Sequence, residues 1–227
     1  MKKRRMSDYA TWIVGTMALL LSLVAGCGNR EVREIRADFE KIPDFFLGKR
    51  HGGQAFVQYT YVRIGDLPDE VLRRQLMREF TDRLFSFDFK EHYPLEDLGW
   101  SEKQDAVDNI ANGLWLRRCI SKSAKTMLMR FNFPLSECWE VRFRYLEKDR
   151  SCRKWMAQAL NRPFDIDNYS TEISFMEEEI LSDRDHNRLS PDDFVTVRAR
   201  LEQILGRPMR TKEQLDEERK KRESRSH

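Results

Sequence analysis

Residues 126–146 read TMLMRFNFPLSECWEVRFRYL, and this stretch decides the fold class that the sequence predicts. On both sides of the central PLSE, polar residues alternate with apolar ones, with Arg130 in the first half and Arg142 and Arg144 in the second. A period of two is typical of a strand with one buried and one solvated face. We therefore predict a β-hairpin with strands at 126–133 and 138–146 and a turn at 134–137.

A third strand is expected at 54–64, QAFVQYTYVRI, which is rich in aromatic and β-branched residues. Helical signals surround the strands, and the clearest is an apolar residue at every fourth position at Leu72, Leu76, Phe80 and Leu84. Further helices are expected at 101–122, 151–160, 171–181 and 191–205. The sequence thus predicts an α+β domain, in which a small antiparallel sheet of about three strands packs with roughly four to six helices.

The last of these helices has the best-defined ends. Ser190 is a favoured N-cap, Pro191 suits the first helical position, and Asp192 and Asp193 place negative charge at the positive end of the helix dipole. Gly206 follows the last apolar residue, as is typical of a helix C-terminus.

The first residues carry the features of an export signal. A cationic KKRR at 2–5 precedes an apolar stretch at 11–23, which is shorter than the about twenty residues that a membrane-spanning helix needs. The stretch ends in Val24-Ala25-Gly26-Cys27. This order of an aliphatic residue, two small residues and cysteine resembles the lipobox of bacterial lipoproteins, and the resemblance covers residues 1–28.

The resemblance implies removal of residues 1–26 as a signal peptide and attachment of acyl chains, such as palmitate, to Cys27. Two or more chains hold a protein stably on a membrane, so the mature chain is expected on an extracytoplasmic membrane surface. In lipoproteins of Gram-negative cells, an Asp after the cysteine favours the inner membrane. Because Gly28 occupies that position, the resemblance implies the outer membrane, facing the periplasm, in such a cell. An uncleaved N-terminal anchor helix is the alternative.

The remaining chain shows no repeat and no linker rich in Ser or Gly. We expect a membrane-proximal tether at 27–42, one domain at 43–207, and a charged tail at 208–227 that is either helical or disordered.

Charge argues against a nucleic-acid partner. The formal net charge of the chain is +3, and the four cations and one anion of residues 1–26 account for it, so the mature protein is close to neutral. Nucleic-acid binding would need an excess of basic residues on the folded domain.

Three cysteines follow Cys27, at Cys119, Cys138 and Cys152. An odd number leaves at least one thiol free or paired between chains. Their spacing is not C-x-x-C, which favours buried structural thiols, although the sequence leaves a disulfide open.

Spaced oxygen ligands between two expected helices make the segment 183–193 resemble an EF-hand loop. Asp183, Asp185, Asn187 and Asp193 are the candidate calcium ligands. The segment departs from the pattern in three ways: it is one residue short, Arg188 replaces the glycine of the turn, and Asp193 replaces the bidentate Glu. A polar turn between helices, closed by an N-cap, is the simpler interpretation.

Arg130, Arg142 and Arg144 would share the solvated face of the predicted hairpin. Such a face could bind an anionic ligand or an acidic protein partner. Cross-strand ion pairs, for example with Glu140, are the alternative.

The function that these features favour is a lipid-anchored envelope protein acting as an interaction or structural module with an envelope protein partner. One alternative is a ligand-binding lipoprotein with calcium at 183–193 as its only cofactor. Another is an envelope hydrolase, but the sequence has no G-x-S-x-G, S-x-x-K or P-loop motif, and the adjacent Glu91 and His92 are poorly placed to act on one substrate atom.

Overall fold

The chain divides into two compact units, residues 1–42 and 43–227, and the computed structural model describes residues 30–162 and 170–224. In the first unit, residues 30–39 form a helix, in which Arg30 and Glu34 form an ion pair one turn apart at 3.0 Å. The short helix α2 (Ile42–Phe46) spans the boundary. The expected signal peptide and Cys27 lie outside the described residues.

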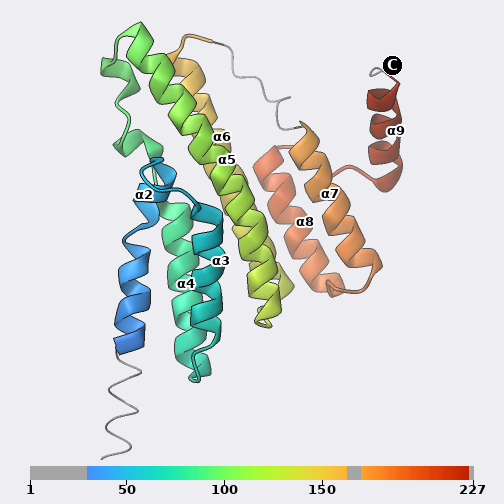
Figure 1. The fold of residues 1–227 in the computed structure, drawn as a ribbon. Helices are drawn as coiled ribbons and strands as arrows, with labels where there is room; N and C mark the ends of the chain where they lie inside the picture. The colour runs from blue at the N-terminus through green and yellow to red at the C-terminus, as the bar shows by residue number, and fades with distance from the viewer. Residues whose placement is uncertain (1–29, 163–169, 225–227) are drawn as a thin grey trace, which may run out of the picture. The chain divides into compact units, whose positions relative to one another are not determined.

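Every regular element that the structure describes in the second unit is helical. The elements are α3 (Gly53–Gly65), α4 (Glu70–Ser86), the short 3-10 helices η1 (Phe89–Glu91) and η2 (Leu95–Asp97), α5 (Trp100–Arg130), α6 (Leu135–Ala159), α7 (Ser170–Asp185), α8 (Pro191–Leu205) and α9 (Lys212–Glu223). Figure 1 shows α5 and α6 side by side, with α3 and α4 on one side of this pair and α7 and α8 on the other. The two longest helices therefore form the centre of the unit.

The predicted α+β fold is wrong, because residues 30–162 and 170–224 contain no β-strand. The segment at 54–64 lies in α3, where Val57, Tyr61 and Ile64 are buried at helical spacing. The segment at 126–133 closes α5, and 138–146 lies inside α6. The predicted turn at 134–137 does mark a reversal of the chain, but it joins two helices.

The position of α6 explains why its pattern is misleading. This helix packs against α5, α4 and α8, and successive residues such as Val141, Arg142 and Phe143 are all buried. A helix that is surrounded on several sides lacks the single apolar stripe of an amphipathic helix. A short run of aromatic and β-branched residues in such a helix cannot be told from a strand by its periodicity.

Three of the helices end at an asparagine in the left-handed conformation. Asn132, Asn161 and Asn187 have φ values of 59°, 51° and 53° and follow α5, α6 and α7. After α5, the Asn132 N–H donates to the Met129 carbonyl and the Phe133 N–H to the Leu128 carbonyl, both at 3.1 Å. This is the Schellman arrangement, which satisfies the last carbonyls of a helix and turns the chain away from its axis.

An aromatic cluster fills the space between α5 and the segments before it. The Phe87 ring lies 5.1 Å from that of Phe46 and 5.0 Å from that of Phe89. The buried Arg117 guanidinium lies over Phe46 and Phe89 and donates to the Phe87 carbonyl. Gly113 allows this approach, because a Cβ there would lie 2.5 Å from the Phe89 ring and 2.9 Å from the Phe46 carbonyl oxygen.

The helix predicted at 191–205 is confirmed together with its ends. The Ser190 Oγ accepts the Asp193 N–H at 3.1 Å, and Gly206 closes α8 with a φ of 69°. The charged tail contains α9, and its one leucine, Leu215, is 3% exposed. Part of the tail is thus a helix of the second unit and packs against α7.

Candidate functional site

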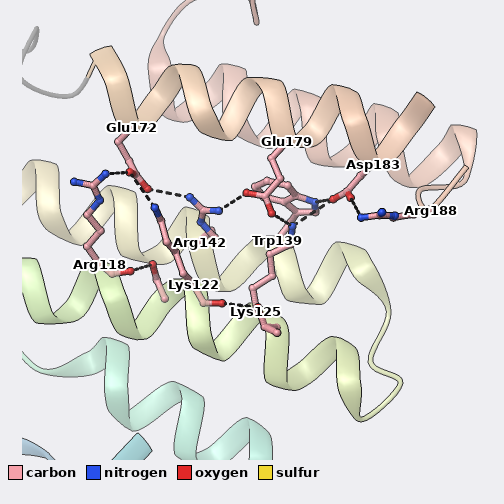
Figure 2. Close-up of polar contacts among 11 residues, drawn as sticks. Arg118, Lys122, Lys125, Trp139, Arg142, Glu172, Glu179, Asp183 and Arg188 are labelled. Atoms are coloured by element: carbon pink, nitrogen blue, oxygen red, sulfur yellow. Dashed lines mark hydrogen bonds and ion pairs between the residues drawn. The ribbon is translucent and has the colours of Figure 1, made fainter. Parts of the chain in front are cut away.

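A cluster of charged side chains joins α7 to α5 and α6 (Figure 2). Helix α5 supplies Arg118, Lys122 and Lys125, which share one helix face because they are spaced by four and three residues. Helix α6 supplies Arg142, α7 supplies acids on one face, and one more arginine follows α7. We call this set the charged cluster, and its members are Arg118, Lys122, Lys125, Arg142, Glu172, Glu179, Asp183 and Arg188.

Arg142 is the central cation of the charged cluster, and its side chain is only 3% exposed. Its Nη2 donates to Glu172 at 2.9 Å and its Nη1 to Glu179 at 2.6 Å. Its buried Nε has no hydrogen-bond acceptor. Glu172 also pairs with Arg118 and lies 3.7 Å from the Lys122 Nζ. The buried arginine therefore draws two carboxylates of α7 towards α6.

The Trp139 indole packs against the charged cluster and contacts two of its members, Lys125 and Asp183. The Lys125 Nζ lies 3.8 Å from the centre of the Trp139 ring, within the range of a cation–π contact. The indole Nε1 donates to Asp183 at 3.0 Å, and the Lys125 Nζ donates to the same carboxylate at 3.3 Å. With Arg188 at 3.4 Å, Asp183 has three partners and is held from several sides.

Glu179 differs from the other two acids because 41% of its side chain is exposed, against 5% for Glu172 and 3% for Asp183. Partial burial by itself would raise the pKa of Glu179. The hydrogen bonds and positive charges of Lys125 and Arg142 outweigh this effect and lower its pKa below the ordinary value of 4.5. Glu179 is therefore ionised at neutral pH while it remains at the solvent edge.

Cations outnumber carboxylates in the charged cluster, five to three among the described residues. Glu178 lies nearby without an ion pair to the cluster, and counting it still leaves an excess of one positive charge. Such an excess beside a partly buried surface favours an additional anionic group.

A pocket with a volume of about 530 Å³ opens beside the cluster. The pocket is lined by cationic, hydroxyl, acidic and aromatic side chains. These are Lys122, Lys125, Arg142, Thr126, Ser182, Glu178, Glu179 and Phe175. The Phe175 side chain is 52% exposed. The pocket thus offers positive charge, hydroxyl groups and an apolar contact to one ligand.

The four candidate calcium ligands do not converge in the structure. Asp183 faces Trp139 and Lys125, and Asp185 pairs with Arg184 at 2.7 Å. Asn187 is the left-handed residue that ends α7, and the Asp193 carboxylate accepts a hydrogen bond at 2.7 Å from the hydroxyl of Ser190, the N-cap of α8. In the part of the chain that the structure describes, no group of three His, Cys, Asp or Glu side chains is arranged to hold a metal ion. Calcium binding at 183–193 stays a prediction from the sequence.

The three candidate arginines do not share a face. The strand on which that prediction rested is absent from the described residues. Arg142 is buried in the charged cluster, and Arg144 pairs with Asp82 at 2.6 Å beside α4. Arg130 is exposed at the end of α5. Cross-helix ion pairs thus replace the predicted solvated surface at two of the three positions.

Cys119, Cys138 and Cys152 carry free thiols. Burial raises the pKa of Cys138 and that of Cys152 to about 12, which keeps both thiols protonated at neutral pH. Cys119 is partly exposed.

Sequence reasoning missed Lys125, Trp139, Glu172 and Glu179. Two spacings could have pointed to them. Cations recur on one face of α5, and Glu172, Glu179 and Asp183 are separated by seven and four residues along α7. Two helix faces of opposite charge predict a pair that packs together through ion pairs.

No protein-family model, curated protein or solved structure matches this chain. Among the described residues, no helix combines the length and the apolar character needed to cross a membrane.

Proposed function

We propose that this protein is a lipid-anchored envelope protein whose second unit binds a protein partner at the pocket beside α7. The order of cations, apolar core and Val24-Ala25-Gly26-Cys27 supports the anchor. The observation that carries the binding role is the excess of cations in the charged cluster, next to an open pocket with an exposed aromatic ring.

Pockets of this composition suit protein contacts. Arginine and aromatic side chains are enriched among the residues that contribute most to binding energy. In this pocket Arg142 is held by its partners in the charged cluster, and Phe175 already projects into solvent. Few side chains would have to be ordered when an anionic group of the partner binds, which reduces the entropic cost of association.

Photo-cross-linking in living cells tests this proposal. A photo-reactive amino acid replaces Phe175 in one variant and Val195 of α8 in a control, since both side chains are exposed, at 52% and 63%. We expect one dominant protein adduct from position 175 and none from position 195. Equal adducts from both positions, or no adduct from position 175, would contradict the proposal.

A pair of charge variants tests the contribution of the cations. Lys122→Gln removes a cation of the pocket, whereas Lys148→Gln removes an exposed cation of α6 outside it. The cross-link from position 175 should weaken several-fold with Lys122→Gln and stay unchanged with Lys148→Gln. The same yield in both variants would remove the electrostatic basis of the proposal.

A further inference from the structure

We infer that the pocket beside α7 is a carboxylate-binding site in which Glu179 is the resident ligand, and that a carboxylate of an acidic peptide segment takes its place when a partner binds. This inference rests on the proposed function, because it names the chemical group by which the partner is recognised.

The contacts of Glu179 define what the two buried cations accept. The Lys125 Nζ donates to one oxygen of Glu179 at 2.5 Å, and the Arg142 Nη1 donates to the other at 2.6 Å. Both cationic side chains are nearly buried, at 5% and 3% exposed. Two fixed donors, one for each oxygen, form a site that matches the geometry of a carboxylate.

Glu179 is the acid that can leave. Glu172 contacts three cations, and Asp183 contacts two cations and an indole, so each is held from several directions. Glu179 contacts only Lys125 and Arg142 among the cluster residues, and its side chain lines the pocket with 41% of its surface exposed. Rotation into water would solvate its carboxylate and leave the two cations in place.

Charge selects the incoming group. A carboxylate adds one negative charge, which matches the excess of one positive charge in the cluster when Glu178 is counted, because the displaced Glu179 stays beside the pocket. A phosphate dianion would bring a second negative charge close to Glu172 and Glu178, which is unfavourable at a partly buried site. The exposed Phe175 ring lies on the same pocket wall and can pack against an apolar neighbour of the carboxylate. A Glu or Asp side chain, or a terminal carboxylate, next to an apolar residue in a peptide fits this site.

Chemical rescue with a small carboxylate tests the inference on the intact mature protein. Glu179→Ala removes the resident carboxylate, and Glu217→Ala removes an exposed acid of α9 as a control. Melting temperatures are measured in sodium acetate, sodium phosphate and sodium chloride at equal ionic strength. We expect a lower melting temperature for Glu179→Ala in chloride, and recovery of half or more of the loss in acetate alone.

Acetate binding is also measured directly, because the stability change in Glu179→Ala can be too small to show rescue. Carbon-13-labelled acetate should show line broadening with Glu179→Ala several-fold greater than with the native protein or Glu217→Ala. Should Glu179→Ala fail to fold, Glu179→Ser, whose short side chain also leaves Lys125 and Arg142 uncovered, takes its place in this measurement. Broadening that is equal in all three proteins, or rescue by phosphate in preference to acetate, would overturn the inference.

These measurements need no partner, which separates the two proposals. A cross-link at position 175 without acetate binding would overturn the carboxylate site alone. Acetate binding without a cross-link would support the carboxylate site but overturn the proposed protein partner, and with it the displacement of Glu179 by that partner.

Discussion

At the scale of single residues, the stability of the charged cluster depends on every buried charge having its partners, more than on the number of ion pairs. Placing Arg142 and Glu172 away from water costs several kcal/mol for each ion, and their mutual attraction offsets that cost only when the hydrogen-bonding partners are in place. Removal of one member therefore lowers the free energy of unfolding more than replacement of both members of an ion pair by apolar or neutral groups does.

The first prediction follows from this asymmetry. Arg142→Met keeps most of the side-chain volume but leaves Glu172 without its closest buried partner, so we expect a loss of about 3–5 kcal/mol in the free energy of unfolding. The double variant Arg142→Met with Glu172→Gln should recover part of this loss. Urea unfolding of the native protein, Arg142→Met, Glu172→Gln and the double variant measures the loss and the recovery. A single variant as stable as the native protein would contradict the prediction.

The second prediction concerns pH. The pKa of Glu179 is lowered in the folded state by Lys125 and Arg142, so its contribution to stability is complete above the ordinary value of 4.5 and is lost as the pH falls through the lowered value. The difference in urea midpoint between the native protein and Glu179→Gln should be constant near neutral pH and shrink below about pH 4.5. A difference that grows on acidification would show that the pKa of Glu179 is raised in the folded state and not lowered.

At the scale of helices, the sequence predicts an element well where local chemistry determines it. Ser190, Pro191 and Gly206 mark α8 at both ends, and the repeat through Leu76, Phe80 and Leu84 marks the buried face of α4. It fails for α3 and α6, because burial among neighbouring helices overrides strand propensity there. The turn at 134–137 is typical of a hairpin by its flanking pattern, but it follows a helix end, which the left-handed Asn132 forms.

The candidate site could be predicted only in pieces. The sequence marks Arg142 as a candidate contact for an anionic ligand and Asp183 as a candidate calcium ligand. The structure brings them into one cluster through Lys125 and Trp139, which lie far from α7 in the sequence. The opposite charges on α5 and α7 favour their pairing, but the spacing within each helix does not show that α6 lies between them and adds Arg142 and Trp139 to the cluster.

The third prediction tests the left-handed end of α7. Asn187 has a φ of 53°, a conformation that costs most L-residues about 1–2 kcal/mol and glycine almost nothing. We expect Asn187→Ala to lower stability by about 1 kcal/mol, and Asn187→Gly to maintain or raise it. Thermal unfolding of both variants checks this. Equal effects of Ala and Gly would argue against a backbone origin.

At the scale of the whole molecule, the anchor and the folded unit make separable contributions to the proposed function. Residues 1–26 carry the formal net charge of the chain, so the remaining chain is close to neutral although one cluster within it is cationic. In the proposed function, the anchor brings the protein to a membrane surface, and the pocket selects the partner.

The fourth prediction addresses the anchor. Cys27→Ser removes the sulfur that would accept the lipid, so labelled palmitate should no longer enter the protein, and the protein should leave the membrane fraction. Cys119→Ser is the matched control and should leave labelling unchanged. Continued labelling of Cys27→Ser would show that the lipid is attached elsewhere.

The uneven distribution of charge has a kinetic consequence. A neutral protein is not attracted as a whole to an acidic partner, but a local field around the charged cluster acts over roughly the Debye length, about 8 Å at physiological ionic strength. If the proposed acidic partner binds at the pocket, attraction by the charged cluster therefore acts only over the last few ångströms of its approach to α7. The association rate constant should fall with added salt, while the lifetime of the complex, which depends on buried contacts, should change little.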